Sequence, residues 1–208
     1  MAFAVMLLFA LLWGSPGGPD AADAAPAAGR TFEGVASCAG STCHGRMEAD
    51  GKVVRQDELK RWQEPSTPGG AHSRAFAVLS GARSRQIAAT LGLGDPTAAP
   101  SCLGCHSTPA TARGPRFLTQ DGVGCEGCHG AASGWISSHY AVGASHAANV
   151  AAGMTALDRP QVRAAVCLDC HFGSDRNGQF VSHRLMAAGH PRISFELDLF
   201  SDDAGASR

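Results

Sequence analysis

Apolar residues occur in short stretches that Gly and Pro interrupt, and several of these stretches are typical of short helices. We expect helices over residues 57–62, 71–80 and 82–91, one that begins at Trp135, one over residues 158–166, and one over about 180–188. No segment shows a convincing strand pattern. The pattern therefore predicts a mainly α protein with extensive loops.

The N-terminal segment is the most apolar, from Ala2 to Trp13. At 12 residues this run is shorter than the roughly 20 that span a bilayer, and it suits the apolar part of a secretory signal. Small residues that favour cleavage follow, ending at Ala24. We expect a periplasmic or otherwise exported protein; a retained membrane anchor is the alternative. The predicted organisation is a signal peptide (1–24), a flexible lead-in (25–37), a single domain (38–200) and a disordered tail (201–208).

The composition changes the picture of the core. The chain has 26 Gly, 11 Pro and only 6% aromatic residues, and many of its hydrophobic residues are Ala, which bury little area each. Something other than Leu, Ile and Phe is therefore expected to fill the interior. The charges are balanced, with 17 Lys and Arg against 18 Asp and Glu and no long charged block, which argues against a nucleic-acid partner.

All eight cysteines fall into four close pairs, and a histidine follows the second cysteine of every pair. Two such thiols can form thioethers with the two vinyl groups of one porphyrin, and the adjacent imidazole then lies under the iron. We therefore expect four covalently bound haem c groups, stacked as the core of the domain. The pairs with their proximal histidines are Cys38/Cys43 with His44, Cys102/Cys105 with His106, Cys125/Cys128 with His129, and Cys167/Cys170 with His171.

Other uses of paired cysteines explain less of this pattern. Zinc sites use C-x-x-C pairs but do not need a histidine after each one. A disulfide framework suits an exported protein and also leaves the histidines unexplained. Three of the pairs are C-x-x-C-H, whereas Cys38 and Cys43 are separated by four residues, so a disulfide or a structural loop remains the alternative at that first pair.

Five histidines remain after the four proximal ones: His72, His139, His146, His183 and His190. Four six-coordinate irons need four distal ligands, and we expect His72, His190, His183 and His139 to supply them, ahead of His146. His139/His146 and His183/His190 are each seven residues apart, a spacing that could serve two neighbouring haems on one helix face. Methionine is the alternative distal ligand, with Met186 as the best placed.

The chain resembles the tetrahaem cytochrome c family related to the electron acceptor of hydroxylamine oxidoreductase. The resemblance rests on the widened Cys38–His44 motif, on His72-Ser-Arg-Ala-Phe, on the Gly122–Gly130 segment and on Gly189-His190-Pro-Arg. It implies stacked haem pairs, mostly bis-histidine irons, and electron transfer. Some relatives keep one five-coordinate haem that can bind small nitrogen ligands.

Electron transfer between redox partner proteins by haem-to-haem hopping is the function that these residues favour, because bis-histidine iron has no open position for a substrate. The alternatives are a small haem enzyme that reduces or oxidises nitrogen compounds at one open haem, and a subunit of a conducting cytochrome filament. The sequence shows no acid–base constellation for catalysis. A membrane-associated electron-transfer complex and a homo-oligomer are further expected settings.

Overall fold

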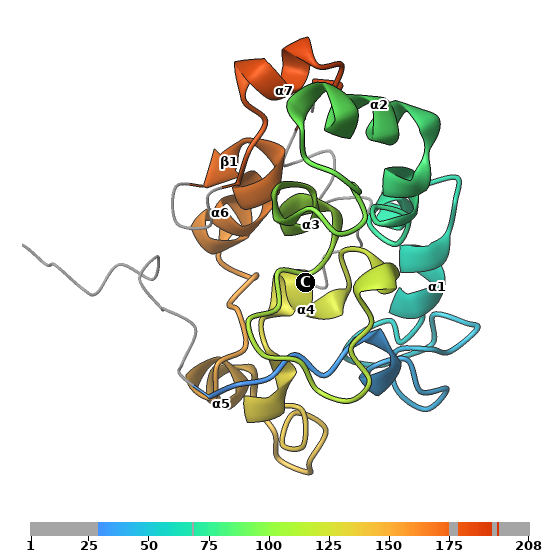
Figure 1. Ribbon diagram of the computed structural model, residues 1–208. Coiled ribbons are helices and arrows are strands. Elements are labelled where there is room, and N and C mark those ends of the chain that lie inside the picture. The colour runs from blue at the N-terminus through green and yellow to red at the C-terminus, as the bar shows by residue number, and fades with distance from the viewer. Residues whose placement is uncertain (1–28, 68, 175–178, 193–194, 196–208) are drawn as a thin grey trace, which may run out of the picture.

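The computed structural model describes residues 29–67, 69–174, 179–192 and 195, and these residues form short helices joined by long loops (Figure 1). The α-helices of this part of the chain are α1 (Glu58–Gln63), α2 (Ala82–Leu91), α3 (Pro100–His106), α4 (Cys125–His129), α5 (His146–Ala151), α6 (Pro160–His171) and α7 (His183–Ala187). Short 3₁₀ turns lie at Val35–Ser37 (η2), Gly69–Ala71 (η3), Ala77–Ser80 (η4), Thr119–Asp121 (η5) and Ala132–Gly134 (η6). The mainly helical, loop-rich class is as predicted.

Two strands of two residues each are the small exception to the helical pattern. β1 (Gly173–Ser174) pairs antiparallel with β2 (Gln179–Phe180), with Gly173 opposite Phe180. They follow α6 directly and return the chain toward α3, where the Gln179 side chain donates to the Gly104 carbonyl. This hairpin therefore connects the fourth cysteine pair to the second.

The predicted helices at 57–62, 82–91 and 180–188 correspond to α1, α2 and α7, and the one at 158–166 is the first part of α6. Gly92 ends α2 in the left-handed conformation (φ 69°), and its N–H bonds to carbonyls of the last turn. Pro160 occupies the first turn of α6, a position that suits proline, and follows the N-cap Arg159, whose side chain makes no capping bond.

Two predicted helices are instead 3₁₀ turns and bends. Residues 71–80 have no α-helix: the Ser73 hydroxyl donates to the Gly70 carbonyl, a local bond that competes with the helical ladder. No α-helix begins at Trp135 either. There Ser138 Oγ donates to the Trp135 carbonyl, and the His139 ring bonds the Ile136 carbonyl. Both segments hold a histidine outside a regular helix.

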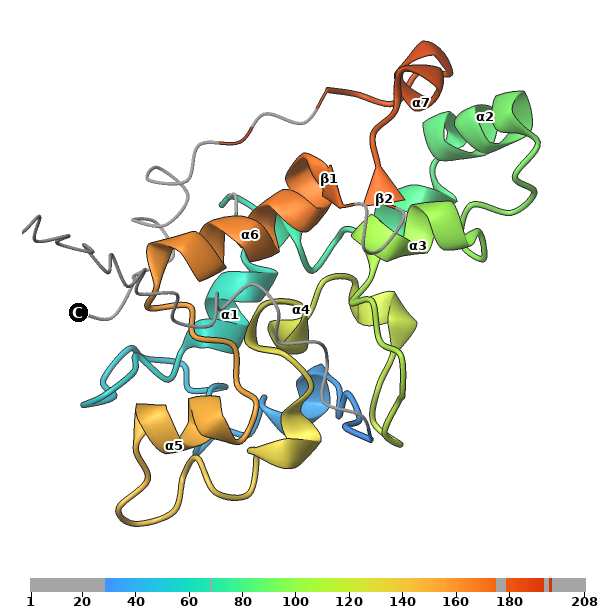
Figure 2. The ribbon, with the colours of Figure 1, turned by 90° about the vertical axis from the view of Figure 1, so that its left-hand side faces the viewer.

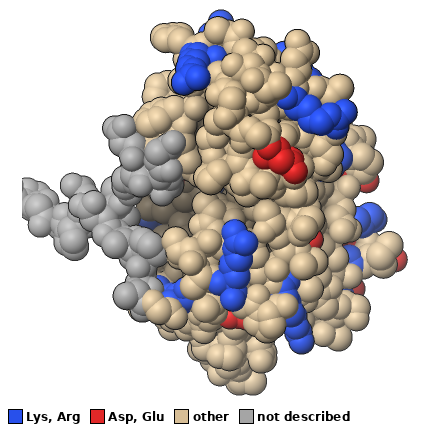
Figure 3. Space-filling view, in the orientation of Figure 1, with Lys and Arg blue, Asp and Glu red and all other residues tan. Residues whose placement is uncertain are grey.

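The elements are arranged along one long direction. α2 and α7 lie at one end, α5 lies at the other, and α4 lies between them, in two views at right angles (Figures 1 and 2). The helices that carry cysteine pairs, α3, α4 and α6, occupy the middle. Basic side chains are scattered over the visible face rather than gathered in one block (Figure 3), in keeping with the balanced charge.

The described residues form only a thin apolar core. Its buried hydrophobic members are Leu79, Ile87, Ala88, Ala99, Ala132, Trp135 and Ala156, of which four are alanines. In the same part of the chain no large side chain is fully buried, while Phe172, next to the fourth histidine of the motifs, is 78% exposed. Side chains alone leave the interior underfilled.

Residues 29–37, the described part of the expected lead-in, are hydrogen bonded to the body of the domain. Thr31 N donates to Ser133 Oγ at 2.8 Å and Phe32 N to the Ala112 carbonyl at 2.9 Å. The expected signal peptide and tail lie outside the described residues. Among the described helices, none has the length and apolar character needed to cross a membrane.

Candidate functional site

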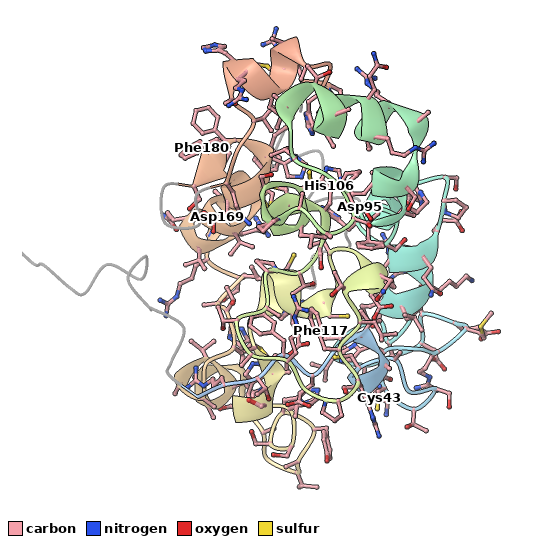
Figure 4. The ribbon with its side chains drawn as sticks, viewed as in Figure 1. Cys43, Asp95, His106, Phe117, Asp169 and Phe180 are labelled. Atoms are coloured by element: carbon pink, nitrogen blue, oxygen red, sulfur yellow. The ribbon has the colours of Figure 1, made fainter. Side chains whose placement is uncertain are left out.

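The cysteine pairs occupy ends of short helices. In α3, α4 and α6 the histidine is the last helical residue. The two cysteines lie four residues and one residue before it, three residues apart, so they share one side of the helix. In α3 and α6 the motif occupies the C-terminal end of the helix, whereas in α4 it makes up the whole helix. The first pair lies in turns after η2, and its Cys43 is exposed (Figure 4).

Three of the motif histidines face a second histidine from a distant segment. The ring centres are 6.2 Å apart for His44 and His139, 6.1 Å for His72 and His171, and 6.2 Å for His106 and His190. Each pair joins one expected proximal ligand to one expected distal ligand. The chain brings them together from segments that are tens of residues apart in the sequence.

The separation of each pair fits a single metal ion between two imidazoles. An imidazole nitrogen binds a first-row metal at about 2.0 Å, and the ring centre lies roughly 1.1 Å beyond that nitrogen, so two rings on opposite sides of one ion have centres about 6.2 Å apart. A direct ring stack would be closer. The three observed separations therefore fit bis-histidine iron, with the porphyrin supplying the other four nitrogens.

Backbone carbonyls set the orientation of three of these rings. Nδ1 of His106 contacts the Ala75 carbonyl at 2.7 Å, Nδ1 of His139 the Ile136 carbonyl at 2.6 Å, and Nδ1 of His190 the Pro191 carbonyl at 2.8 Å. A carbonyl can only accept, so Nδ1 carries the proton, and the neutral ring then presents its Nε2 lone pair. This is the tautomer that an iron ligand needs.

His44 has a different partner. Its Nδ1 lies 3.0 Å from Glu58 Oε2, at the start of α1, and the backbone N–H of Leu59 donates to the His44 carbonyl at 2.9 Å. The carboxylate orients the ring as a carbonyl does but brings a negative charge. His106, by contrast, is the last residue of α3 and is half-buried in the middle of the molecule (Figure 4), and that burial lowers its pKa and favours the neutral ring.

His129 is the motif histidine without such a ring partner among the described residues. Its residue keeps exposed surface, although the protein atoms around the ring lower its pKa by burial. His146, at the start of α5, is near enough to interact electrostatically with it. The His146 Nε2 atom itself faces Asp158 Oδ1 at 3.7 Å.

The structure places His183 differently from the other expected distal ligands. It is exposed at the first residue of α7, and in the described part of the chain it has no ring contact with a motif histidine. His190, seven residues later, follows the end of α7 and reaches His106. The two histidines are therefore not presented from one helix face.

Thiols of different motifs lie next to each other. The Cys125 thiol beside Cys38 raises the pKa of Cys38, and the Cys105 thiol beside Cys170 raises the pKa of Cys170. Burial, followed by the charges of Cys167 and Cys125, raises the pKa of Cys128 to about 11. The motifs thus adjoin in the order first, third, fourth, second, so the second and third, which are consecutive in the sequence, are not adjacent in this order.

The third motif is tied to the N-terminal segment by a buried carboxylate. Glu126, between the two cysteines of α4, is 4% exposed. Its Oε1 accepts from the N–H groups of Glu33 at 2.8 Å and Ala132 at 2.7 Å, and its Oε2 accepts from Gly34 N at 2.7 Å. These bonds satisfy the buried charge and fix the approach of the chain to the first motif.

The geometry also bears on the two alternative uses of the cysteines, disulfide bonds and a structural zinc site. Within the described residues, which include all eight, no disulfide is formed, and no group of three or more His, Cys, Asp or Glu side chains could hold a metal ion alone. A structural zinc ion needs four protein ligands, whereas a haem iron needs two. The paired histidines therefore suit haem.

Comparison with known proteins gives one finding. The family model described as "Cytochrome c554 and c-prime" matches residues 37–130, a segment that contains the first three cysteine motifs and His72. Neither the curated proteins nor the solved structures yielded a match. Over residues 37–130 the chain is therefore similar to the family described as cytochrome c554 and c-prime, a family of c-type cytochromes whose covalently bound haem c the histidine pairs fit.

Proposed function

We propose that the chain is an exported tetrahaem c-type cytochrome that transfers electrons between redox partner proteins. The observation that carries the proposal is the set of three histidine pairs at 6.1–6.2 Å, because an iron held between two imidazoles has no open position for a substrate. Haem iron supplies one-electron redox chemistry, and the protein supplies ligation, orientation and spacing.

The arrangement of the thiols supports a continuous electron path. Cys38 adjoins Cys125, Cys128 lies near Cys167, and Cys170 adjoins Cys105. Each thiol is the attachment point for one porphyrin edge, so porphyrins on adjoining thiols have their edges close together. The path runs from the first motif through the third and fourth to the second.

The test is a haem count combined with EPR of the oxidised protein. Four haems per chain by pyridine haemochrome, with low-spin signals from at least three, is the expected result. Three haems, with Cys38 and Cys43 unmodified, would refute the fourth site. High-spin iron at two or more haems would overturn the electron-carrier proposal.

One observation favours a second candidate, a haem enzyme acting on nitrogen compounds. The His146 Nε2 atom faces Asp158 rather than His129, which leaves the third motif as the place for a five-coordinate iron. Nitrite, hydroxylamine and nitric oxide would be the compounds to test. Turnover that disappears with loss of a single high-spin signal would support this candidate, and four low-spin haems would exclude it.

A further inference from the structure

The first motif has a ligand partner of a kind that the other oriented histidines do not have. His44 Nδ1 lies 3.0 Å from a carboxylate oxygen of Glu58, whereas the Nδ1 atoms of His106, His139 and His190 contact backbone carbonyls. Both kinds of partner occur in this one chain, so the difference can be described without comparing it with another protein. It makes the electronic environment of the first site distinct.

The Glu58 carboxylate is held in place on both oxygens. Oε2 accepts from His44, and Oε1 accepts from Gln56 N at 3.1 Å. Glu58 is also the first residue of α1, where a negative charge is favourable to the helix. The nearby Arg55 is engaged with Asp57, at 3.1 Å between Nε and Oδ1, so it does not withdraw the carboxylate from His44.

A charged acceptor acts on a metal ligand more strongly than a neutral one. The carboxylate draws the Nδ1 proton toward itself, which makes the imidazole a stronger donor through Nε2. A stronger donor stabilises ferric iron relative to ferrous iron. The Glu58 side chain is 41% exposed, so water screens part of the effect.

We infer that Glu58 is a positioning residue that tunes the haem of the Cys38/Cys43 motif, lowering its reduction potential through the Nδ1–H of His44. The inference rests on the proposed haem site. In the redox step, ferric iron accepts one electron from a redox partner protein and becomes ferrous, and the Nδ1 proton stays between His44 and Glu58. The site is thereby biased toward the oxidised state relative to a site with a carbonyl partner.

The haem can be followed by its EPR signal. The His44 and His139 rings are nearly parallel, with an angle of 11°, whereas the other two pairs are at 76° and 81°. Parallel axial imidazoles split the iron orbitals that perpendicular imidazoles leave nearly equal in energy, so the first haem gives a rhombic low-spin signal. A redox titration of the intact holoprotein monitored at that signal separates the potential of the first haem from those of the two haems whose rings are crossed.

The decisive variant is Glu58→Gln, with Glu48→Gln as the control that removes an exposed carboxylate from the neighbouring loop. Glu58→Gln should raise the reduction potential of the rhombic component by about 59 mV, which corresponds to about a tenfold change in the equilibrium constant for its one-electron reduction. The other components and Glu48→Gln should stay at wild-type values. Glu58→Asp, whose carboxylate is one methylene shorter, should give a smaller shift in the same component.

The outcomes separate this inference from the proposed function. An unchanged rhombic component in Glu58→Gln, with all four haems attached, overturns the tuning role, and so does an equal shift in Glu48→Gln. If Glu58→Gln does not retain the first haem, Glu58→Asp decides, and the absence of any shift there overturns the role. A wild-type protein that lacks the first haem overturns the proposed site itself.

Discussion

The buried carboxylate of Glu126 offers the sharpest test of how the chain holds its motifs in place. It accepts three backbone hydrogen bonds, from Glu33, Gly34 and Ala132. In Glu126→Gln the remaining oxygen can keep the two bonds made by Oε1, but an amide nitrogen then faces the Gly34 N–H, which is also a donor. One charge-assisted bond is lost and two donors are left facing each other.

The magnitude follows from those contacts. A hydrogen bond to a charged group contributes about 1.5–3 kcal/mol, and an unsatisfied buried donor costs about 1–3 kcal/mol. We expect Glu126→Gln to lower the free energy of unfolding by about 3 kcal/mol. Glu126→Ala loses all three bonds, and its loss should reach about 4–5 kcal/mol, near the upper end for single substitutions.

Denaturant unfolding of the holoprotein, followed by circular dichroism, measures this loss as a lower midpoint at unchanged slope. Glu33→Gln is the matched control, because Glu33 lies in the same segment and its Oε1 accepts from the Thr31 hydroxyl at 2.6 Å rather than from a buried backbone N–H. That variant should change the free energy by no more than about 0.5 kcal/mol. Equal midpoints for Glu126→Gln and Glu33→Gln would refute the reasoning.

Three further predictions concern the histidine pairs and the first motif. Gly122→Ala should convert one low-spin haem to high spin by EPR, because the new Cβ, at φ 71°, would lie 2.5 Å from the carbonyl oxygen of the ligand His72 and displace it. The control Gly92→Ala, at φ 69° with nothing within 4 Å of the new Cβ, should leave all EPR signals unchanged. Identical spectra for the two variants would contradict this account. His139→Ala should abolish the rhombic signal, and its survival would show that another residue ligates that iron. Cys43→Ala should leave one unreacted vinyl group on the first haem, which a shifted haemochrome band would report; an unshifted band would show that Cys43 forms no thioether.

The chemistry of the sites was more predictable than their geometry. The Cys-Cys-His spacing specifies local chemistry, and the family match over residues 37–130 supports the c-type cytochrome that it predicted. The pairing of His44 with His139 depends on how loops return across the molecule, and no local pattern encodes that. Helices were predictable where Gly92 and Pro160 mark their ends, but not at His139, where side-chain bonds to carbonyls replace the helical ladder.

The partners of the ligands were missed for a similar reason. Glu58 is 14 residues from His44, and Glu126 is 93 residues from Glu33. A carboxylate within a C-x-x-C-H motif is a signal that could have pointed to Glu126, because a carboxylate between two attachment cysteines needs hydrogen-bond donors around it. Nothing in the sequence distinguishes Glu58 from the other surface carboxylates before the fold places it.

The adjoining thiols have a consequence for the maturation of the protein. Cys38 beside Cys125, and Cys105 beside Cys170, are the same sulfur atoms that thioether formation and oxidation compete for. A disulfide between either pair would block two attachment sites at once. Within each pair the contact between the thiols raises the pKa of Cys38 and of Cys170 and lowers the pKa of Cys125 and of Cys105, so Cys125 and Cys105 are the more reactive thiols in either reaction. In the proposed four-haem arrangement, a thiol that has reacted with a vinyl group can no longer form that disulfide with its neighbour, so each attachment would protect the next motif.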